Sequence, residues 1–504
     1  MYDDQSYTVN AWVIAGGDTV ILRGGPWRVG FDQGTSGSDK WCVHGTGPYD
    51  CTNPPLPAGS ATQHTRILGE NYASCGATNK TQIFGGFAVG VALNLGGAQF
   101  VDVSCIEITR HSQCIRHGYP AYPSQCSSSY PLDDYDGEGI VTNVQTHDLT
   151  LTDMWIHGHT DRGIIGPIGG VVTCLRCNIS YNGMAGWDFD DGNSTPFGAG
   201  SKWNFLYSTL EWNGCNQEYP ITHTYPAASC YSQSTGGYGD GVGTPANTGT
   251  GMSVVVDHST FRYNTQDGID LGHMDAGNNT LNITNSLSYA NTGGQFKWGA
   301  FFQTVNFINN IALSNCLRMS APIPGAPSTF NANLGDFCRA QDAISFNFLQ
   351  NGTANFLNNT IISYSPTTFD MNCWDPAGCS NSTFTFKNNI VRAYNNPNTY
   401  TLGGQVGGPG AFYYQAPIGN VVRSNNLYYG IRNISCPTGN TAEYCTDPLF
   451  VNEPMWTGEA SLDNFNFNLT VGSPAKGAGA SQPSLTLDYN GLLRANPPSI
   501  GAIE

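Results

Sequence analysis

The apolar residues of this chain come in short runs in which they alternate with polar residues and end at asparagine or glycine. Two examples are "GVVTCLRCNISYNG" from Gly170 and "FQTVNFINNIALSN" from Phe302. Alternation with a period of two predicts β-strands, and Asn and Gly at the ends predict tight turns. No long segment carries apolar residues with the spacing of a helix. The pattern therefore predicts an all-β chain of short strands.

A repeat of 27 residues organises these strands. The stretches "GYGDGVGT" from Gly237, "NTQDGIDL" from Asn264 and "NTGGQFKW" from Asn291 are spaced by 27 residues, and "NGMAGWDF" from Asn182 has the same form. Units of this length cannot bury an apolar face alone, so they stack on their neighbours. We predict a right-handed parallel β-helix in which equivalent residues form columns about 4.8 Å apart. The recurrent Asn column is interpreted as architecture.

The ends of the chain and its long irregular stretches suggest one domain, 1–504. Residues 16–30 resemble the opening coil of secreted right-handed β-helix proteins, and residues 447–452, 472–479 and 488–504 resemble their closing segment. We expect N-terminal coils over 1–136, central coils with the site over 137–440, and a capping segment over 441–504. Long loop insertions rich in Gly, Pro and Cys are predicted at about 31–80, 106–137, 214–237 and 319–341.

Composition narrows the class of partner and the compartment. The net charge of −17 argues against nucleic acid as a partner. The 16 cysteines favour disulfides and an oxidising compartment. The CxxC pair Cys174 and Cys177 is expected to form a disulfide or buried thiols, since no histidines complete a zinc site. The chain contains no run of about 18 apolar residues, so no membrane-spanning helix is predicted. We expect a secreted protein whose signal segment is absent from this chain.

The repeat places acidic residues in two columns. Asp240 and Asp267 share one column, and Asp188, Gly243, Asp270 and Lys297 share the next. Carboxylates gathered in this way repel one another unless a cation compensates them. Converging oxygen ligands are what Ca²⁺ takes, at about 2.3–2.6 Å. The sequence therefore predicts a calcium site with a lysine one coil away.

These segments resemble the family nine polysaccharide lyases, which are pectate-cleaving right-handed β-helices. The matching stretches are "GDGVG" around Asp240, "QDGID" around Asp267 and Asp270, and "GQFKWG" around Lys297. The resemblance implies that Asp240, Asp267 and Asp270 bind one Ca²⁺ and that Lys297 is the catalytic base. The sequence departs from the family pattern at Gln266, where the family has an aspartate. The Gln266 amide could still coordinate, and Asp188 could supply the missing carboxylate.

The implied chemistry is β-elimination from a uronic-acid-containing polysaccharide. A cation on the uronate carboxylate stabilises the enolate charge that develops when the C5 proton is removed. The base must be neutral, which a lysine reaches only beside positive charge or when buried. Arg318 and Arg339 are candidate substrate-binding residues for neighbouring uronates, with an ordinary structural role as the alternative. The expected partner is an acidic polysaccharide, and the protein is expected to be a monomer.

Two other functions fit the same residues. A β-helix glycoside hydrolase would use paired carboxyls from Asp188, Asp190 and Asp191 with Asp240 or Asp267, would need no metal, and would leave Lys297 without a role. A non-catalytic surface or carbohydrate-binding β-helix would use calcium only for stability. The fold does not decide among these functions.

Overall fold

The computed structural model describes most of the chain and divides into two compact units. The first unit contains the described residues up to Met252, and the second contains those from Ser253 onward. The described residues are 12–31, 39–40, 51–52, 54–86, 89–112, 134, 136–189, 198–215, 217, 219, 230, 238–243, 250–272, 278–299, 302–315, 342–348, 350–364, 367–373, 378–394, 411–414, 418–431, 442–453 and 463–504.

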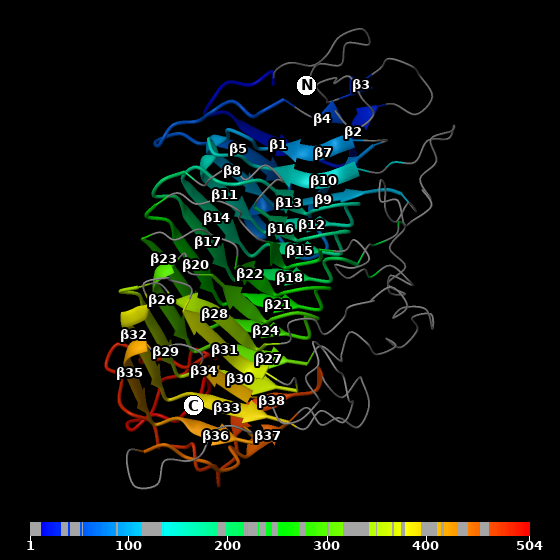
Figure 1. The fold of residues 1–504 in the computed structure, drawn as a ribbon. Coiled ribbons are helices and arrows are strands. Elements are labelled where there is room, and N and C mark those ends of the chain that lie inside the picture. The colour runs from blue at the N-terminus through cyan, green and yellow to red at the C-terminus, as the bar shows by residue number, and fades with distance from the viewer. Residues whose placement is uncertain are drawn as a thin grey trace. The chain divides into compact units, whose positions relative to one another are not determined.

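The first unit is built from three sheets of parallel strands (Figure 1). Sheet 1 contains β1 (Thr19–Leu22), β5 (Thr65–Gly69), β8 (Gln99–Ser104), β11 (His147–Thr152), β14 (Val171–Leu175) and β17 (Lys202–Leu206). Sheet 2 contains β4 (Cys51–Thr52), β7 (Val89–Asn94), β10 (Asp136–Val141), β13 (Ile164–Ile165), β16 (Trp187–Asp188) and β19 (Val242–Gly243). Sheet 3 contains β2 (Trp27–Phe31), β6 (Thr81–Gly85), β9 (Ile106–Arg110), β12 (Trp155–His157), β15 (Asn178–Ser180) and β18 (Thr209–Glu211), with β3 (Asp39–Lys40) antiparallel to β2.

The second unit repeats this plan with its own strands in the same three positions. Sheet 1 has β20 (Ser253–Asp257), β23 (Asn279–Thr284), β26 (Phe302–Ile308), β29 (Thr353–Leu357), β32 (Cys379–Lys387) and β35 (Ile418–Ser424). Sheet 2 has β22 (Ile269–Leu271), β25 (Phe296–Trp298), β28 (Ile344–Phe348), β31 (Thr367–Cys373) and β34 (Ala411–Tyr414). Sheet 3 has β21 (Thr260–Arg262), β24 (Leu287–Tyr289), β27 (Ile311–Ser314), β30 (Thr360–Ser363), β33 (Ile390–Ala393) and β36 (Leu427–Tyr429). An antiparallel pair, β37 (Phe450–Asn452) and β38 (Asn466–Leu469), follows.

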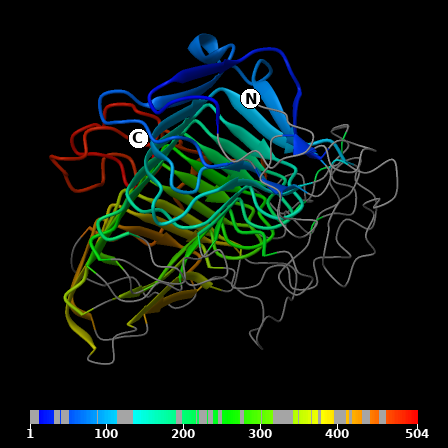
Figure 2. The ribbon, with the colours of Figure 1, turned by 90° about the horizontal axis from the view of Figure 1, so that it is seen from above.

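The chain visits sheet 1, sheet 3 and sheet 2 in turn and then returns to sheet 1, so each round is one coil of a parallel β-helix. Figure 2 shows strands of successive coils lying side by side within each unit. The predicted 27-residue register is present in the second unit, where Ser253 pairs with Thr280, Thr260 with Leu287, and Ile269 with Phe296. The prediction of an all-β parallel β-helix is confirmed.

The interior of each unit is filled by aromatic side chains from the inward positions of the strands. In the first unit Trp187 and Trp203 are fully buried and meet edge to face, with ring centroids 5.6 Å apart. In the second unit Trp298 stacks on Phe346 at 5.0 Å and Phe346 on Phe356 at 5.3 Å. Because inward and outward positions alternate along a strand, the residues between these aromatics face outward.

Asparagine side chains bridge successive coils, as the repeat predicts. Asn291 Oδ1 accepts two hydrogen bonds from Asn264. The Asn264 backbone N–H donates one at 3.0 Å, and Asn264 Nδ2 donates the other at 2.9 Å. The Asn291 amide in turn donates to Phe261 O, Ser288 Oγ and Gln295 Oε1 at 3.1, 3.0 and 2.8 Å. Asn182 donates to Asn213 in the same way in the first unit.

Replacing Asn291 with alanine is expected to lower the free energy of unfolding by about 2–4 kcal/mol. Asn291 is fully buried, and its loss leaves several buried polar groups without partners. Denaturant unfolding of the disulfide-bonded protein measures this. The matched control is Asn282→Ala, since Asn282 is a half-buried residue of sheet 1 that accepts one bond from Asn306 at 2.8 Å. A loss in Asn282→Ala equal to that in Asn291→Ala would contradict the architectural role of the buried column.

Two of the predicted loop insertions contain strands. β5 lies within 31–80, and β9 lies within 106–137. The prediction was wrong for these strands because each is a five-residue segment next to a stretch rich in Gly, Pro and Cys. Their inward residues Ile67 and Ile108 are buried in the core of the coil. Most of 214–237 and all of 319–341 lie outside the described residues.

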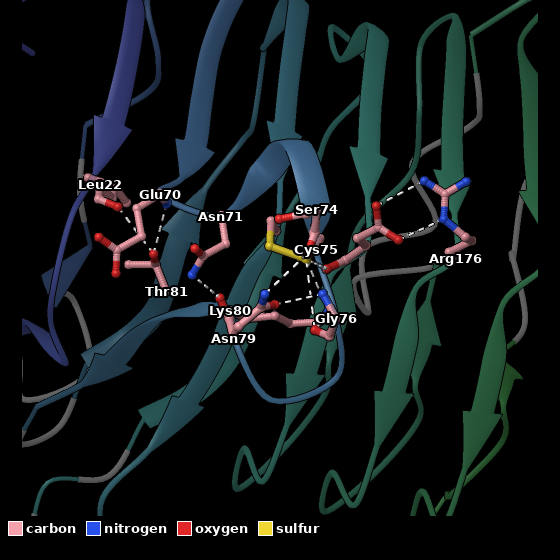
Figure 3. Close-up of a disulfide and its surroundings, with 12 residues drawn as sticks. Leu22, Glu70, Asn71, Ser74, Cys75, Gly76, Asn79, Lys80, Thr81 and Arg176 are labelled. Carbon is pink, nitrogen blue, oxygen red and sulfur yellow. Dashed lines mark hydrogen bonds and ion pairs between the residues drawn. A yellow bond between two sulfur atoms is a disulfide. The ribbon is translucent and has the colours of Figure 1, made fainter.

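The turn that contains the 3₁₀-helix η1 (Tyr72–Ser74) is fastened to the coil by a disulfide from Cys75 to Cys105 (Figure 3). Asn79 closes the turn, because its Oδ1 accepts from Gly76 N at 2.6 Å and its Nδ2 donates to Ser74 O at 3.2 Å. Lys80 Nζ donates to Gly76 O at 2.9 Å. The turn is therefore held by covalent and polar contacts and not by apolar burial.

Other cysteines also form disulfides, as the composition predicts. Cys174 pairs with Cys177, Cys215 with Cys230, and Cys373 with Cys379, and no cysteine is free within the described residues. The CxxC pair is thus a disulfide. No helix in the described part of the chain is long and apolar enough to cross a membrane.

Candidate active site

Lys297 lies on β25, on the outward face of sheet 2 in the second unit. Asp270 and Lys297 are register partners on β22 and β25, as the repeat predicts. Lys297 Nζ is 2.6 Å from Asp270 Oδ2 and 3.2 Å from Asp267 Oδ2. The lysine side chain is 28% exposed, whereas the side chains of Asp267 and Asp270 are 8% and 6% exposed. A cationic group with access to solvent is therefore held between two buried carboxylates.

Backbone N–H groups fix the two carboxylates. Asp267 Oδ1 accepts from Gly294 N on the next coil, and Asp270 Oδ1 accepts from Gly272 N at 2.7 Å. A Cβ at Gly272 would lie 2.7 Å from Asp270 Oδ1 and 3.0 Å from Lys297 Cε. A side chain there would shift the Asp270 carboxylate or the Lys297 side chain.

The environment of Asp267 favours its neutral form. The pKa of Asp267 is raised to about 6, chiefly by burial and also by the neighbouring charge of Asp270. Lys297 and the hydrogen bond from Gly294 act in the opposite direction.

Two further acids, which sequence reasoning missed, continue the same columns beyond Lys297. Ser345 follows Lys297 in the register, and Asp370 follows Ser345. Asp342 precedes β28, and burial together with the charges of Asp370 and Asp267 raises its pKa well above the usual range. The signal was present in the sequence, because "QDAIS" at 341–345 repeats "QDGID" at 266–270.

Asp188 and Asp240 belong to the first unit. Asp188 pairs in register with Gly243, as predicted, and a Cβ on Gly243 would lie 3.5 Å from Asp188 Oδ1. Asp188 Oδ2 accepts a 2.6 Å hydrogen bond from Arg162 Nε, which sequence reasoning did not foresee. Asp240 is buried, and its backbone O accepts from Gly186 N.

Arg162 gathers three carboxylates in the first unit. Besides Asp188, its Nη1 lies 3.2 Å from Glu138 Oε1 and 3.4 Å from Asp161 Oδ2. Burial, and then the charge of Asp161, raises the pKa of Glu138 to about 8. One arginine faces three half-buried carboxyl groups, and the raised pKa of Glu138 favours its protonated form near neutral pH.

The free energy of unfolding is expected to fall as pH rises from about 5 to 8. The folded state holds the Glu138 proton more tightly than the unfolded chain, so it binds more protons across this range and loses that advantage as pH rises. The loss amounts to a few kcal/mol at most. Denaturant unfolding at several pH values measures it. Glu138→Gln should flatten the slope and be the more stable protein at pH 8, and an unchanged slope would contradict this account.

The remaining predicted site residues are placed as follows. Gln266 is half-buried, and its backbone O accepts from Gly293 N at 3.0 Å. Arg318 and Arg339, and the acids Asp190 and Asp191 of the hydrolase alternative, lie outside the described residues. Within the described residues, no group of three or more His, Cys, Asp or Glu side chains is gathered closely enough to hold a metal ion.

The oxygen atoms around Lys297 are of the kind that a hard cation binds. Asp267 and Asp270 offer carboxylate oxygens, which Ca²⁺ prefers. The Oδ2 atoms of both acids face Lys297, so a cation would compete with the ammonium group for them. These two acids account for only part of a calcium coordination shell, which takes six to eight oxygens.

Comparison with known proteins gives distant structural similarity. No protein-family model matches the sequence, and no curated protein matches it. The chain is similar to the crystal structure of pectate lyase Pel9A, with 13% identity, 97% of this chain and 98% of that chain covered, and a TM-score of 0.45. It is also similar to the crystal structure of the Dettilon tailspike protein (gp208), with 10% identity, 72% and 59% coverage and a TM-score of 0.27. Both similarities are too distant to indicate the activity of this chain.

Proposed function

We propose that this protein is a secreted polysaccharide lyase that cleaves a uronic-acid-containing polysaccharide by β-elimination, with Lys297 as the base. The observation that carries the proposal is the position of Lys297, part-exposed on the outward face of sheet 2 between the buried carboxylates of Asp267 and Asp270. The resemblance to family nine lyases is part of the proposal.

The reaction requires Lys297 to accept the C5 proton of a uronate. Neighbouring carboxylates favour the ammonium form of a lysine, so Lys297 can act as a base only when Asp267 and Asp270 are neutralised. Ca²⁺ bound by these two acids would supply that neutralisation and would stabilise charge on the substrate carboxylate. The backbone donors Gly294 N and Gly272 N hold the carboxylates in place, which keeps Lys297 aligned.

The proposal includes Asp240 as a further calcium ligand, with Gln266 or Asp188 completing the set. Asp188 can take this role only if its ion pair with Arg162 is broken. Arg318 and Arg339 remain proposed contacts for neighbouring uronates. The disulfides accord with the proposed extracellular location.

Ultraviolet absorbance of the C4–C5 double bond tests the function on a panel of uronans, with calcium and with chelator. We expect an absorbance increase with wild-type protein and calcium, and none with Lys297→Ala or with chelator. Release of reducing ends without ultraviolet absorbance, despite chelator, would overturn the proposal in favour of hydrolysis.

Hydrolysis is the second candidate because of Glu138. A carboxyl group with a raised pKa, such as Glu138, beside a second carboxyl group is an arrangement of an acid and a base found in glycosidases. Glu138 would be the acid and Asp188, held by Arg162, the base. In this case Glu138→Gln abolishes reducing-end release, whereas Lys297→Ala retains it.

A further inference from the structure

Asn-x-Ser/Thr sequences, in which x is not proline, recur along the chain and form the acceptor motif for asparagine-linked glycans. The structure sorts the motifs of the described residues by the exposure of their asparagine. Exposed asparagines stand at Asn278, Asn351, Asn381 and Asn468. Half-buried or buried asparagines stand at Asn79, Asn178, Asn282 and Asn358. We refer to the exposed group as the exposed acceptors.

The exposed acceptors hold their side-chain amides away from the core. Asn468 lies on β38 between the buried residues Phe467 and Leu469, so its side chain points outward. Asn381 lies near the start of β32, and Asn351 lies in the turn before β29. No hydrogen bond joins the side-chain amide of an exposed acceptor to another described residue. The nitrogen to which a glycan is attached is therefore accessible at each of them.

Most of the exposed acceptors belong to one row of motifs at the edge where the chain enters sheet 1. Thr280 on β23 pairs with Thr304 on β26, Thr304 pairs with Thr353 on β29, and Thr353 pairs with Thr383 on β32. Except at Thr304, the residue two positions earlier in the chain is an exposed acceptor, and the threonine completes its motif. At Thr304 that position is Phe302. The repeat of the coil therefore repeats the motif along one edge.

The motif at Asn358 is incompatible with a glycan in the folded chain. Asn358 is fully buried. Its Nδ2 donates to Ser499 O at 3.2 Å and to Gly501 O at 3.4 Å, and its Oδ1 accepts from Asn388 Nδ2 at 3.1 Å. A sugar on this nitrogen would replace one of the donated protons and would occupy space that the C-terminal segment fills. A chain modified there would not reach this fold.

Attachment of a glycan is a group transfer to the amide nitrogen from a lipid-linked oligosaccharide pyrophosphate. A bond forms between Nδ2 and the anomeric carbon of the first sugar, and the bond from that carbon to the pyrophosphate oxygen breaks. The lipid pyrophosphate leaves, and Nδ2 loses one proton. The transfer takes place in an oxidising compartment of the class in which disulfides form. The disulfide from Cys373 to Cys379 ends two residues before Asn381, which accords with maturation in such a compartment.

We infer that the folded protein carries asparagine-linked glycans at the exposed acceptors and none at Asn358. The glycans are independent of the proposed lyase activity, because no exposed acceptor belongs to the Lys297 site. Glycans are bulky and solubilising, so a row of them covers the edge where the chain enters sheet 1 in the second unit.

Site occupancy in the secreted protein tests this modification. The full chain is secreted from a eukaryotic host, and its glycans are removed by a peptide N-glycosidase in heavy-oxygen water, which converts each modified asparagine into labelled aspartate. Mass spectrometry of the peptides should find the label at the exposed acceptors and unlabelled asparagine at Asn358. Unlabelled asparagine throughout the exposed acceptors of the folded protein, or labelled residue 358 at the same occupancy, would overturn the assignment.

Threonine variants separate glycan attachment from folding. Thr353→Val and Thr383→Val remove the hydroxyl that the motif requires and keep a β-branched residue on the strand, so each should lose the glycan of its own motif alone. The matched control is Thr304→Val, which lies in the same column, completes no motif and should keep every glycan. If Thr353→Val is not secreted, Asn351→Gln, changed at an exposed position, should be secreted and lose the same glycan. A Thr353→Val protein that keeps the glycan on Asn351 would contradict the assignment.

Discussion

Lys297→Ala is expected to reduce the rate of uronan cleavage by about 10²–10⁴-fold, the contribution typical of a general base. Lys297 is the one amine held at the Asp267 and Asp270 carboxylates in the described structure, so no neighbouring group there can replace it. The fall should appear in kcat, with a smaller change in KM, because proton removal takes place in the transition state.

Lys297→Arg should lose as much activity as Lys297→Ala. Arginine keeps the positive charge and the ion pairs, but it stays protonated in proteins and cannot accept the C5 proton. The matched control is Lys387→Ala at the end of β32, which should retain wild-type activity. An arginine variant with substantial activity would show that the residue acts through its charge and not as a base.

The double variant Asp267→Asn/Asp270→Asn is expected to lose the stabilisation by calcium. If these acids bind the ion, wild-type protein should gain about 2.7 kcal/mol of unfolding free energy at a calcium concentration 100 times the Kd, and the double variant should gain almost nothing. Asparagine keeps an oxygen that can accept from Gly294 N and Gly272 N, so the local fold should persist.

Denaturant unfolding with and without calcium measures this difference. Asp257→Asn serves as the control, because Asp257 lies on β20 in the same unit. Its carboxylate forms hydrogen bonds with the side chains of Asn285 and His258. It should retain the full calcium increment. A double variant that still gains the full increment would place the calcium ligands elsewhere in the chain.

The repeat predicted those parts of the structure that depend on regular spacing. Asp270 and Lys297 are 27 residues apart and pair in register, so their ion pair could be anticipated from the sequence. The Asn264 and Asn291 bridge followed from the same spacing. In a stack of coils, equal offsets become neighbouring positions, which is why sequence reasoning was accurate here.

Sequence reasoning failed where the spacing is irregular or where a long side chain crosses columns. The long segment between β27 and β28 breaks the repeat, so Asp342 and Asp370 were not recognised although they continue the Lys297 columns. Arg162 reaches both Glu138 and Asp188 from one coil, and nothing in the local pattern around Arg162 reveals that reach.

The mass of the products from a uronan digested in calcium tests the central claim most directly. Elimination by Lys297 predicts that new non-reducing ends are unsaturated and lighter by one water than those of a hydrolase, and that Lys297→Ala yields none. Saturated products of full hydrolytic mass, formed equally by Lys297→Ala, would contradict the account.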